Sequence, residues 1–336
     1  MNLTKKQIDD LNIELTVEVA PEDYAEEVHK KLAERRRTAE FKGFRKGMVP
    51  ASLIKRVYGE QVLVDAVNDV VTSSLDKYIN DNALHLLGEP LGSETNQPEI
   101  EWAESNSFTF VFDAALSPEI NVEVEAADEI VKYSITTSAK EKATAIESYK
   151  KYYEERNKDN ENPEVKSDEE IEKEVTERLK EEHKQEAEWR LSKDIRDFYV
   201  AKAGVKLPEE FLKRWLFVAN QGKISKEDIE KDFAGFCEDF KWQLVRGSLM
   251  QKFGFTVEHD DIYEAAKAYV SYQYAMYGLG NVPEEMITEA VGNILKDRRQ
   301  LERLSEQVED NKVIAKIKET VKFKEKKISS EKFREL

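Results

Sequence analysis

The sequence predicts an α+β fold class, in which an N-terminal α+β domain with a small antiparallel sheet precedes an extended all-α domain with helical arms. Apolar and polar residues alternate with period two only in the first part of the chain. Helix caps and apolar spacings of three and four residues dominate the rest. Charged residues form 36% of the chain, against about 25% in ordinary domains, which favours long solvated helices. The expected domains are 1–131 and 132–336.

The first elements are a strand and a helix. Residues 11–19 alternate between apolar and polar side chains, which is typical of a half-buried strand. Pro21 suits the first turn of a helix, and Tyr24, Val28 and Leu32 recur every fourth residue, so we expect this face to pack on the sheet. The last turn carries three cations, which a helix C-terminus favours: Arg35, Arg36 and Arg37.

A loop and a second helix follow. Residues 42–50 interrupt the helical pattern with two glycines and a proline, which predicts an exposed loop between helices. Residues 51–79 carry an apolar stripe at helical spacing. Phe108, Phe110 and Phe112 then share one strand face, and 120–124 is expected to be another alternating strand. The phenylalanines could stack on bases, but without cations on that strand we favour a core role.

Beyond Tyr133 we expect only helices. Two serines have capping-box spacing, Ser138 with Glu141 and Ser167 with Glu170, around a polar loop at 157–163. This pattern predicts an antiparallel hairpin arm within 134–203. Further helices are expected to begin at Pro208, Ser225 and Pro283, the last being one long helix through residue 304.

Catalytic and cofactor motifs are not found. The sequence has no phosphate-binding Gly-x-x-x-x-Gly-Lys-Ser/Thr loop, no His-Glu-x-x-His pair and no Gly-x-Ser-x-Gly elbow. Cys237 is the only cysteine and the four histidines are scattered, so we expect no cofactor, no metal and no disulfide. No apolar run approaches the ~18 residues of a membrane span, and no signal peptide is evident, so we expect a cytoplasmic protein without a membrane partner.

Charge is distributed unevenly along the chain. The formal net charge is −17, yet residues 30–56 hold ten cations and two carboxylates, a net +8, so the remaining residues carry −25. This asymmetry predicts one anion-docking site on an otherwise repelling molecule. Within that segment, glycines let the backbone protrude, Phe44 offers an aromatic face, and Arg45 and Lys46 suit phosphate or carboxylate contacts.

The same loop carries a family resemblance. Gly43, Phe44, Arg45, Gly47 and Pro50 form a Gly-Phe-Arg-x-Gly-x-x-Pro pattern that resembles the signature of the bacterial trigger factor family. The resemblance continues in the 108–112 strand, and it resumes at residues 205–209 and 321–333. These segments together span most of the chain.

The resemblance implies an ATP-independent, ribosome-associated chaperone that binds nascent polypeptides at the exit tunnel and delays their misfolding. Its partners would be a large-subunit protein and rRNA, unfolded nascent chains, and a second copy of the chain away from the ribosome. The signature and the charge pattern together predict the ribosome-binding residues, which are Gly43, Phe44, Arg45, Lys46, Gly47 and Pro50, with Arg35, Arg36 and Arg37 assisting.

One departure concerns the prolyl-isomerase domain that the family carries. Residues 93–203 contain no glycine and only three prolines, whereas a β-rich catalytic domain depends on tight turns that favour glycine. We therefore expect a helical hairpin at 134–203 in its place, and no enzyme. Two alternatives stay open: a peptidyl-prolyl cis-trans isomerase, and an RNA-binding protein with a basic loop.

A second candidate surface lies in the helical part. Aromatic and methionine side chains there could form an adaptable client-binding surface, although inter-helix packing is the stronger explanation for tyrosines at helical spacing. The residues are Tyr269, Tyr272, Tyr274, Met276 and Tyr277.

Overall fold

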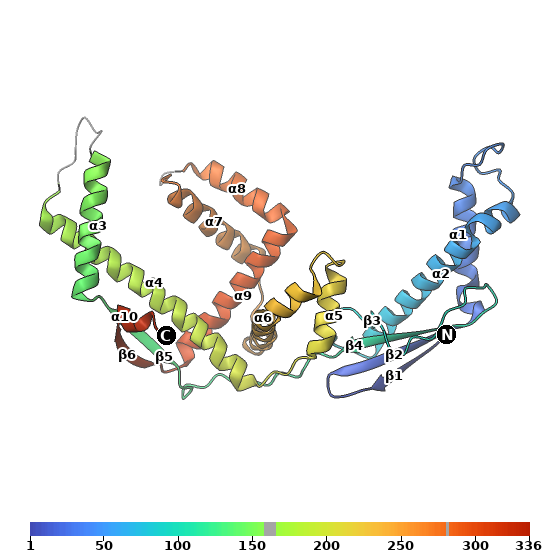
Figure 1. Cartoon of the computed structure of the whole chain (residues 1–336), viewed down its shortest axis with the longest axis horizontal. Helices are drawn as coiled ribbons and strands as arrows, with labels where there is room; N and C mark the ends of the chain where they lie inside the picture. Colours follow the sequence, from blue (N-terminus) through green and yellow to red (C-terminus); the bar gives the residue numbers. More distant parts are fainter. Residues whose placement is uncertain (158–165, 280–281) are drawn as a thin grey trace. The chain divides into compact units, whose positions relative to one another are not determined.

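The computed structural model describes residues 1–157, 166–279 and 282–336, in two compact units (Figure 1). The first unit comprises Met1–Glu119 with Lys206–Cys237, and the second comprises Ile120–Val205 with Glu238–Leu336. The boundaries of these two units differ from those of the expected domains 1–131 and 132–336. The division into those two functional domains stays a prediction. Apart from Asn157, the polar loop predicted at 157–163 lies outside the described residues.

The first unit is built on the predicted small antiparallel sheet. Its strands β1 (Asn2–Gln7), β2 (Asn12–Val19), β3 (Leu91–Gly92) and β4 (Phe108–Ala115) lie in the order β1-β2-β4-β3. Strands β2 and β4 form the central pair, and all neighbouring strands of this sheet are antiparallel. The alternation in β2 therefore places Ile13, Leu15, Val17 and Val19 on the buried side.

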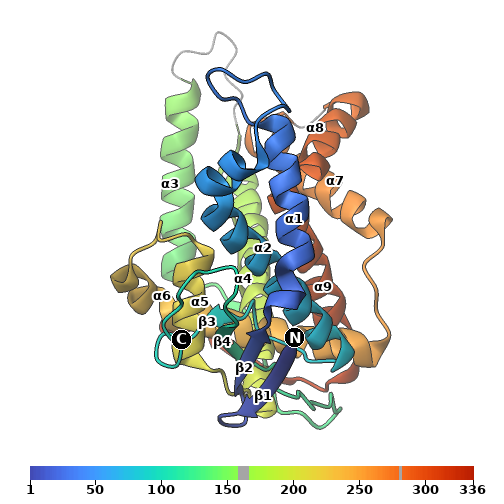
Figure 2. The ribbon, with the colours of Figure 1, turned by 90° about the vertical axis from the view of Figure 1, so that its right-hand side faces the viewer.

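Two helices cover this sheet. Helix α1 (Pro21–Thr38) and helix α2 (Ala51–Asp81) lie side by side (Figure 2). Their apolar stripes join the strands in one core that holds Tyr24, Val28 and Phe108. Trp102 lies against Phe108, with ring centroids 5.0 Å apart. The strand phenylalanines are thus core residues and no stacking platform for bases. Helix α5 (Glu209–Ala219) belongs to the same unit.

The segment after β4 differs from the prediction. Residues 120–124 form no strand, because side chains of helix α6 (Lys226–Phe253) take their carbonyls: Ser248 donates to the Ile120 oxygen at 3.1 Å and Lys252 to the Val122 oxygen at 3.0 Å. The expectation of helices alone beyond Tyr133 is also wrong. Strand β5 (Val131–Thr136) pairs in parallel with strand β6 (Lys324–Ser329).

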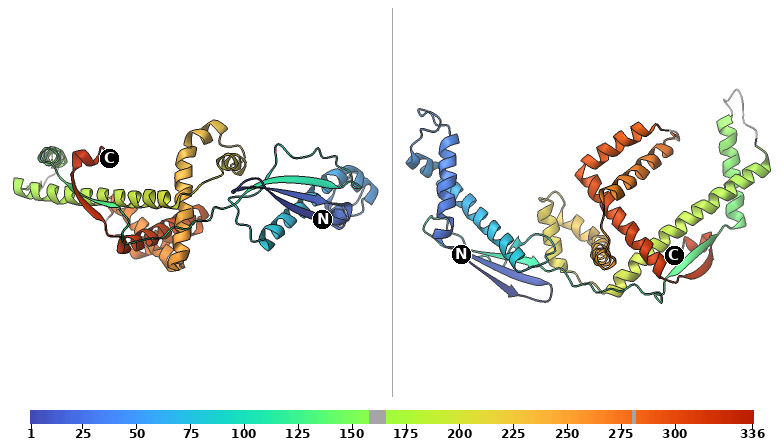
Figure 3. Two further views of the ribbon diagram at one scale, coloured as in Figure 1. Left: turned by 90° about the horizontal axis from the view of Figure 1, so that it is seen from below. Right: turned by 180° about the vertical axis from the view of Figure 1, so that it is seen from behind.

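The predicted hairpin is present in the second unit. Helix α3 (Ala139–Asn157) packs on helix α4 (Asp168–Ala203), which runs as one continuous helix (Figure 3). Lys142 pairs with Glu172 at 2.6 Å, and Lys150 pairs with Asp168, so the two helices are antiparallel. The capping box of Ser167 with Glu170 is formed.

The remaining helices of the second unit are α7 (His259–Met276), α8 (Glu284–Lys296), α9 (Arg298–Thr320) and the short α10 (Ser330–Phe333). The single long helix predicted from Pro283 through 304 is therefore two helices. Asp297 ends the first and caps the second, since its Oδ1 accepts from the backbone N–H of Arg299 at 2.9 Å.

A buried polar network ties the second unit together. The Tyr199 hydroxyl donates to Asp128 at 2.7 Å, and the Lys202 ammonium lies 2.6 Å from the same carboxylate. Burial alone would raise the pKa of Asp128, but the hydrogen bonds from Lys202, the Glu125 N–H and Tyr199 hold it below its ordinary value. The carboxylate therefore stays charged inside the core.

None of the described helices has the length and apolar character of a membrane span.

Candidate functional site

The loop between α1 and α2 consists of two successive turns. The Phe44 N–H donates to the Phe41 carbonyl at 3.1 Å, and the Met48 N–H donates to the Arg45 carbonyl at 2.9 Å. Gly43 has φ +94° and Gly47 has φ +82°, both in the left-handed region that favours glycine. The two glycines are thus required by the backbone path that the loop follows.

The base of the loop is fixed to the helices. Val49 is fully buried, and the Arg36 Nε donates to its carbonyl at 2.9 Å. The Phe41 ring meets the Tyr58 ring edge to face at 6.1 Å, and the Arg35 guanidinium lies 5.9 Å from the centroid of the Tyr58 ring. Two of the predicted assisting arginines therefore hold the loop base.

The tip of the loop, residues 42–48, points its side chains outward. Phe44 is 43% exposed, and Arg45 and Lys46 are exposed. Lys46 lies 3.5 Å from Glu40, a weak surface contact, and Arg45 forms no ion pair with any residue that the structure describes. An aromatic ring and two cations are thus presented together, as the sequence predicts.

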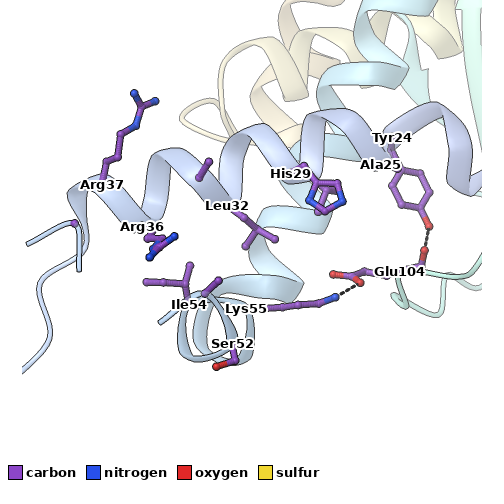
Figure 4. Close-up of a pocket in the computed structure, with 14 residues that line it drawn as sticks. Tyr24, Ala25, His29, Leu32, Arg36, Arg37, Ser52, Ile54, Lys55 and Glu104 are labelled. Atoms are coloured by element: carbon purple, nitrogen blue, oxygen red, sulfur yellow. Dashed lines mark hydrogen bonds and ion pairs between the residues drawn. The ribbon is translucent and has the colours of Figure 1, made fainter. Parts of the chain in front are cut away.

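A groove that the sequence did not reveal adjoins the loop (Figure 4). It has a volume of about 890 Å³ and lies between α1 and the first turn of α2, with Gly47 on its wall. Its apolar floor is formed by Tyr24, Val28 and Ile54, which are buried. Small side chains on the facing helix surfaces leave this space open, and they are the signal that could have found it: Ala25, Ala33, Ala51 and Ser52.

One end of the groove is closed by a polar cluster. The Tyr24 hydroxyl lies 2.5 Å from the Glu104 carbonyl oxygen and 3.0 Å from that of Asn106. Burial, and then the charge of Glu104, raise the pKa of Tyr24, so this hydroxyl stays a neutral donor. Lys55 pairs with the Glu104 carboxylate at 2.5 Å. The groove thus combines an apolar floor with charged side chains at its edge.

The second candidate surface lies on α7 and just beyond it. Tyr272 is 65% exposed, Met276 71% and Tyr277 82%, and Tyr269 is also exposed. Tyr274 instead packs on the cluster that α7 shares with α8 and α9. The inter-helix packing explanation therefore applies to Tyr274 and not to the other four. Leu279 and Met286, which the sequence analysis did not single out, are also exposed.

Among the described residues, no group of three or more His, Cys, Asp or Glu side chains could hold a metal ion. The structure thus defines a two-unit α+β protein that has an exposed cationic loop in its first unit and an exposed aromatic helix surface in its second.

Sequence models of known families identify it more closely. One described as bacterial trigger factor protein matches residues 1–149, and one described as probable trigger factor, C-terminal domain, matches residues 187–336. Together they span most of the chain, and the chain belongs to the trigger factor family.

Individual relatives agree with this assignment. The trigger factor of Francisella tularensis subsp. holarctica (strain OSU18) is 29% identical over 161 residues, which are 45% of this chain and 35% of that protein. That of Azospirillum brasilense is 36% identical over 90 residues, 27% of this chain and 20% of that protein. The chain thus spans about a third or less of the length of these relatives.

A solved structure shares the fold. It is presented as "Promiscuous Substrate Recognition in Folding and Assembly Activities of the Trigger Factor Chaperone" and matches 94% of this chain and 99% of its own, with a TM-score of 0.54. At 14% identity the likeness supports the architecture alone.

Proposed function

We propose that this protein is an ATP-independent chaperone of the cytoplasm that docks on the large ribosomal subunit and binds nascent polypeptides. The observation that carries the proposal is the loop tip, where Phe44, Arg45 and Lys46 are exposed together on a fixed base. Membership of the trigger factor family supports it.

The docking contacts follow from the chemistry of the tip. Arg45 and Lys46 bind rRNA phosphates or acidic side chains of an exit-tunnel protein, and Phe44 fills a pocket on the ribosome. Of the three arginines expected to assist, Arg35 and Arg36 act by holding the loop base, and Arg37 lies on the groove wall. Each phosphate neutralised adds about 0.7 to 0.9 to the log–log salt slope of binding.

Client binding is assigned to the helical residues 132–336, and ribosome docking to residues 1–131. Exposed tyrosine and methionine side chains adapt to varied apolar segments, so Tyr269, Tyr272, Met276 and Tyr277 are the proposed contacts, while Tyr274 supports them from the packed side. Homodimerisation away from the ribosome, as the family resemblance implies, is a further part of this proposal.

The proposed chaperone has no isomerase activity. The described part of residues 134–203 consists of the end of β5 and the helices α3 and α4, and neither matching family model is described as an isomerase. A proline-containing tetrapeptide assay tests this directly. Turnover above the uncatalysed rate would restore the enzyme alternative.

The docking proposal is tested by ribosome co-sedimentation. Phe44→Ala, Arg45→Ala and Lys46→Ala together should abolish co-sedimentation, because the exposed ring and both cations are lost. The matched control removes two cations and one exposed ring from α3 in the variant Lys150→Ala, Lys151→Ala, Tyr152→Ala. Unchanged binding by the loop variant contradicts the proposal, and tight binding to naked RNA favours the RNA-binding alternative.

A further inference from the structure

The groove between α1 and α2 combines an apolar floor with a cationic rim. Tyr24, Val28 and Ile54 are buried at the floor, and Leu32 is half-buried beside them. His29, Arg36, Arg37 and Lys55 line the rim. Leu32 and Arg36 of α1 extend toward the start of α2, whereas the Arg37 side chain points away from it (Figure 4).

The rim has an excess of positive charge. Glu104 is its one lining carboxylate, and Lys55 neutralises it at 2.5 Å. The Arg36 Nε donates to the Val49 carbonyl, which is neutral, so the guanidinium charge of Arg36 is not compensated by this contact. Arg37 forms no ion pair with any residue in the described part of the chain. An occupant should therefore bring carboxylates of its own.

The floor decides between a protein and a nucleic acid as occupant. Phosphates have to stay solvated or fully paired, so they gain little from a floor of valine and isoleucine. An aliphatic side chain gains about 25 cal/mol for each Å² that it removes from water there. The exposed loop tip, in contrast, presents its cations to solvent. A phosphate can contact them there and keep its own hydration.

We propose that the groove binds a protein segment that presents an apolar side chain flanked by carboxylates, and that this segment belongs to the protein on which the loop docks. The proposal rests on the proposed ribosome docking. Gly47 lies on the groove wall and in the loop, so one partner surface reaches both. The loop tip and the groove are then two halves of one docking site, the first cationic and aromatic, the second apolar with a cationic rim.

Ala33 gives a clean test, because it lines the groove and is exposed. Ala33→Glu places a carboxylate on the groove wall, and Ala33→Gln adds the same volume without charge. Gln61→Glu makes an equal charge change at an exposed α2 position outside the groove. The probe is a short synthetic peptide of leucine and glutamate, and its counterpart has lysine in place of glutamate.

The wild-type chain should bind the glutamate peptide and bind the lysine peptide at least tenfold more weakly. Ala33→Glu should weaken the glutamate peptide about tenfold, Ala33→Gln less than threefold, and Gln61→Glu not measurably. Equal binding of both peptides, or equal loss in both Ala33 variants, overturns the proposal. The proposal is also overturned if Ala33→Glu weakens the binding of a uridine oligonucleotide, since RNA would then be the occupant.

Co-sedimentation with ribosomes separates this inference from the docking proposal. Ala33→Glu should lower ribosome affinity about tenfold while Gln61→Glu retains it. If Ala33→Glu binds ribosomes as the wild type does and the loop variant does not, the groove inference alone is wrong. If the loop variant binds as the wild type does, the docking proposal itself fails.

Discussion

The loop tip at residues 42–48 and the exposed surface of α7 both present aromatic side chains to solvent, but for different structural reasons. In the loop, two glycines with positive φ carry Phe44 off the helical path and place it between cations. On α7 the helix is regular, and Tyr272 and Met276 are exposed because the packed face already holds Ala266 and Val270.

This difference in construction corresponds to a difference in chemistry. A ring held between cations on a fixed base favours one anionic partner of defined shape. Tyrosine and methionine side chains without cations among them favour many apolar partners of variable shape. We therefore expect that mutations in one surface will leave the binding activity of the other surface intact.

Charge reversal in the loop should give the largest effect. Arg45→Glu with Lys46→Glu replaces attraction by repulsion at the tip, so ribosome affinity should fall more than a hundredfold, about 2.7 kcal/mol or more. Suppression of aggregation of an unfolded model protein should stay at the wild-type level. Loss of both activities would show that the two surfaces are not separable. The measurements are co-sedimentation and light scattering.

Removal of the α7 aromatic surface should have the reverse effect. In the variant Tyr272→Ala, Met276→Ala, Tyr277→Ala, aggregation suppression should fall about fivefold to tenfold, because each lost side chain removes apolar contact area. Ribosome binding should not change. The control is Tyr152→Ala with Trp189→Ala, which removes two exposed rings elsewhere. An equal loss in the control would mean that general surface apolarity, and not this surface, binds clients.

Glycine substitutions in the loop test its backbone path. Gly43→Ala or Gly47→Ala forces a residue with a side chain into positive φ, at a cost of about 1 to 2 kcal/mol. The tip should lose its conformation and ribosome affinity should fall about fivefold to thirtyfold. Gly59→Ala, inside α2 and with no positive φ, is the matched control and should leave affinity unchanged. A wild-type affinity in both loop variants would show that this conformation is not needed.

Acid should weaken the support of the α7 surface at the start of that helix. A hydrogen bond from Lys312, followed by one from the Glu258 N–H, lowers the pKa of Asp261 at the start of α7. A lowered carboxyl pKa stabilises the fold above the unfolded value, and that contribution is lost as pH falls below about 4. The amide NMR shift of Glu258, whose N–H donates to the Asp261 carboxylate, should move in this range. Asp261→Asn should remove that movement, and an unchanged movement in the variant would show that another carboxyl causes it.

The sequence predicts most of the first unit because its periodicities are clear. The alternation at 11–19 gives β2, the fourfold spacing of Tyr24, Val28 and Leu32 gives the buried face of α1, and the glycines locate the loop. Strand β1 has one partly buried residue and otherwise polar exposed side chains, so it has no alternation to detect. The groove arises from the spacing of α1 and α2. Its only signal in the sequence is a few small residues on the two helices.

The second unit is harder to predict because its pairing is long-range. Strand β6 is rich in lysine and mostly exposed, so nothing in residues 324–329 indicates a strand without its partner. Residues 120–124 do alternate, but side chains of α6 satisfy their carbonyls. The break at Asp297 is a helix cap inside a pattern that continues in phase. The assigned ribosome and client contacts stay predictions.

The parallel pairing of Val131–Thr136 with Lys324–Ser329 bears on how this protein is itself made. A chain emerges during translation from its N-terminal end, so β5 leaves the ribosome long before β6 has been synthesised. Pairs of such high sequence separation form slowly, since a long loop has to close first. The second unit therefore completes its fold only after residue 329 is free, whereas β2 and β4 can pair once residue 115 has emerged.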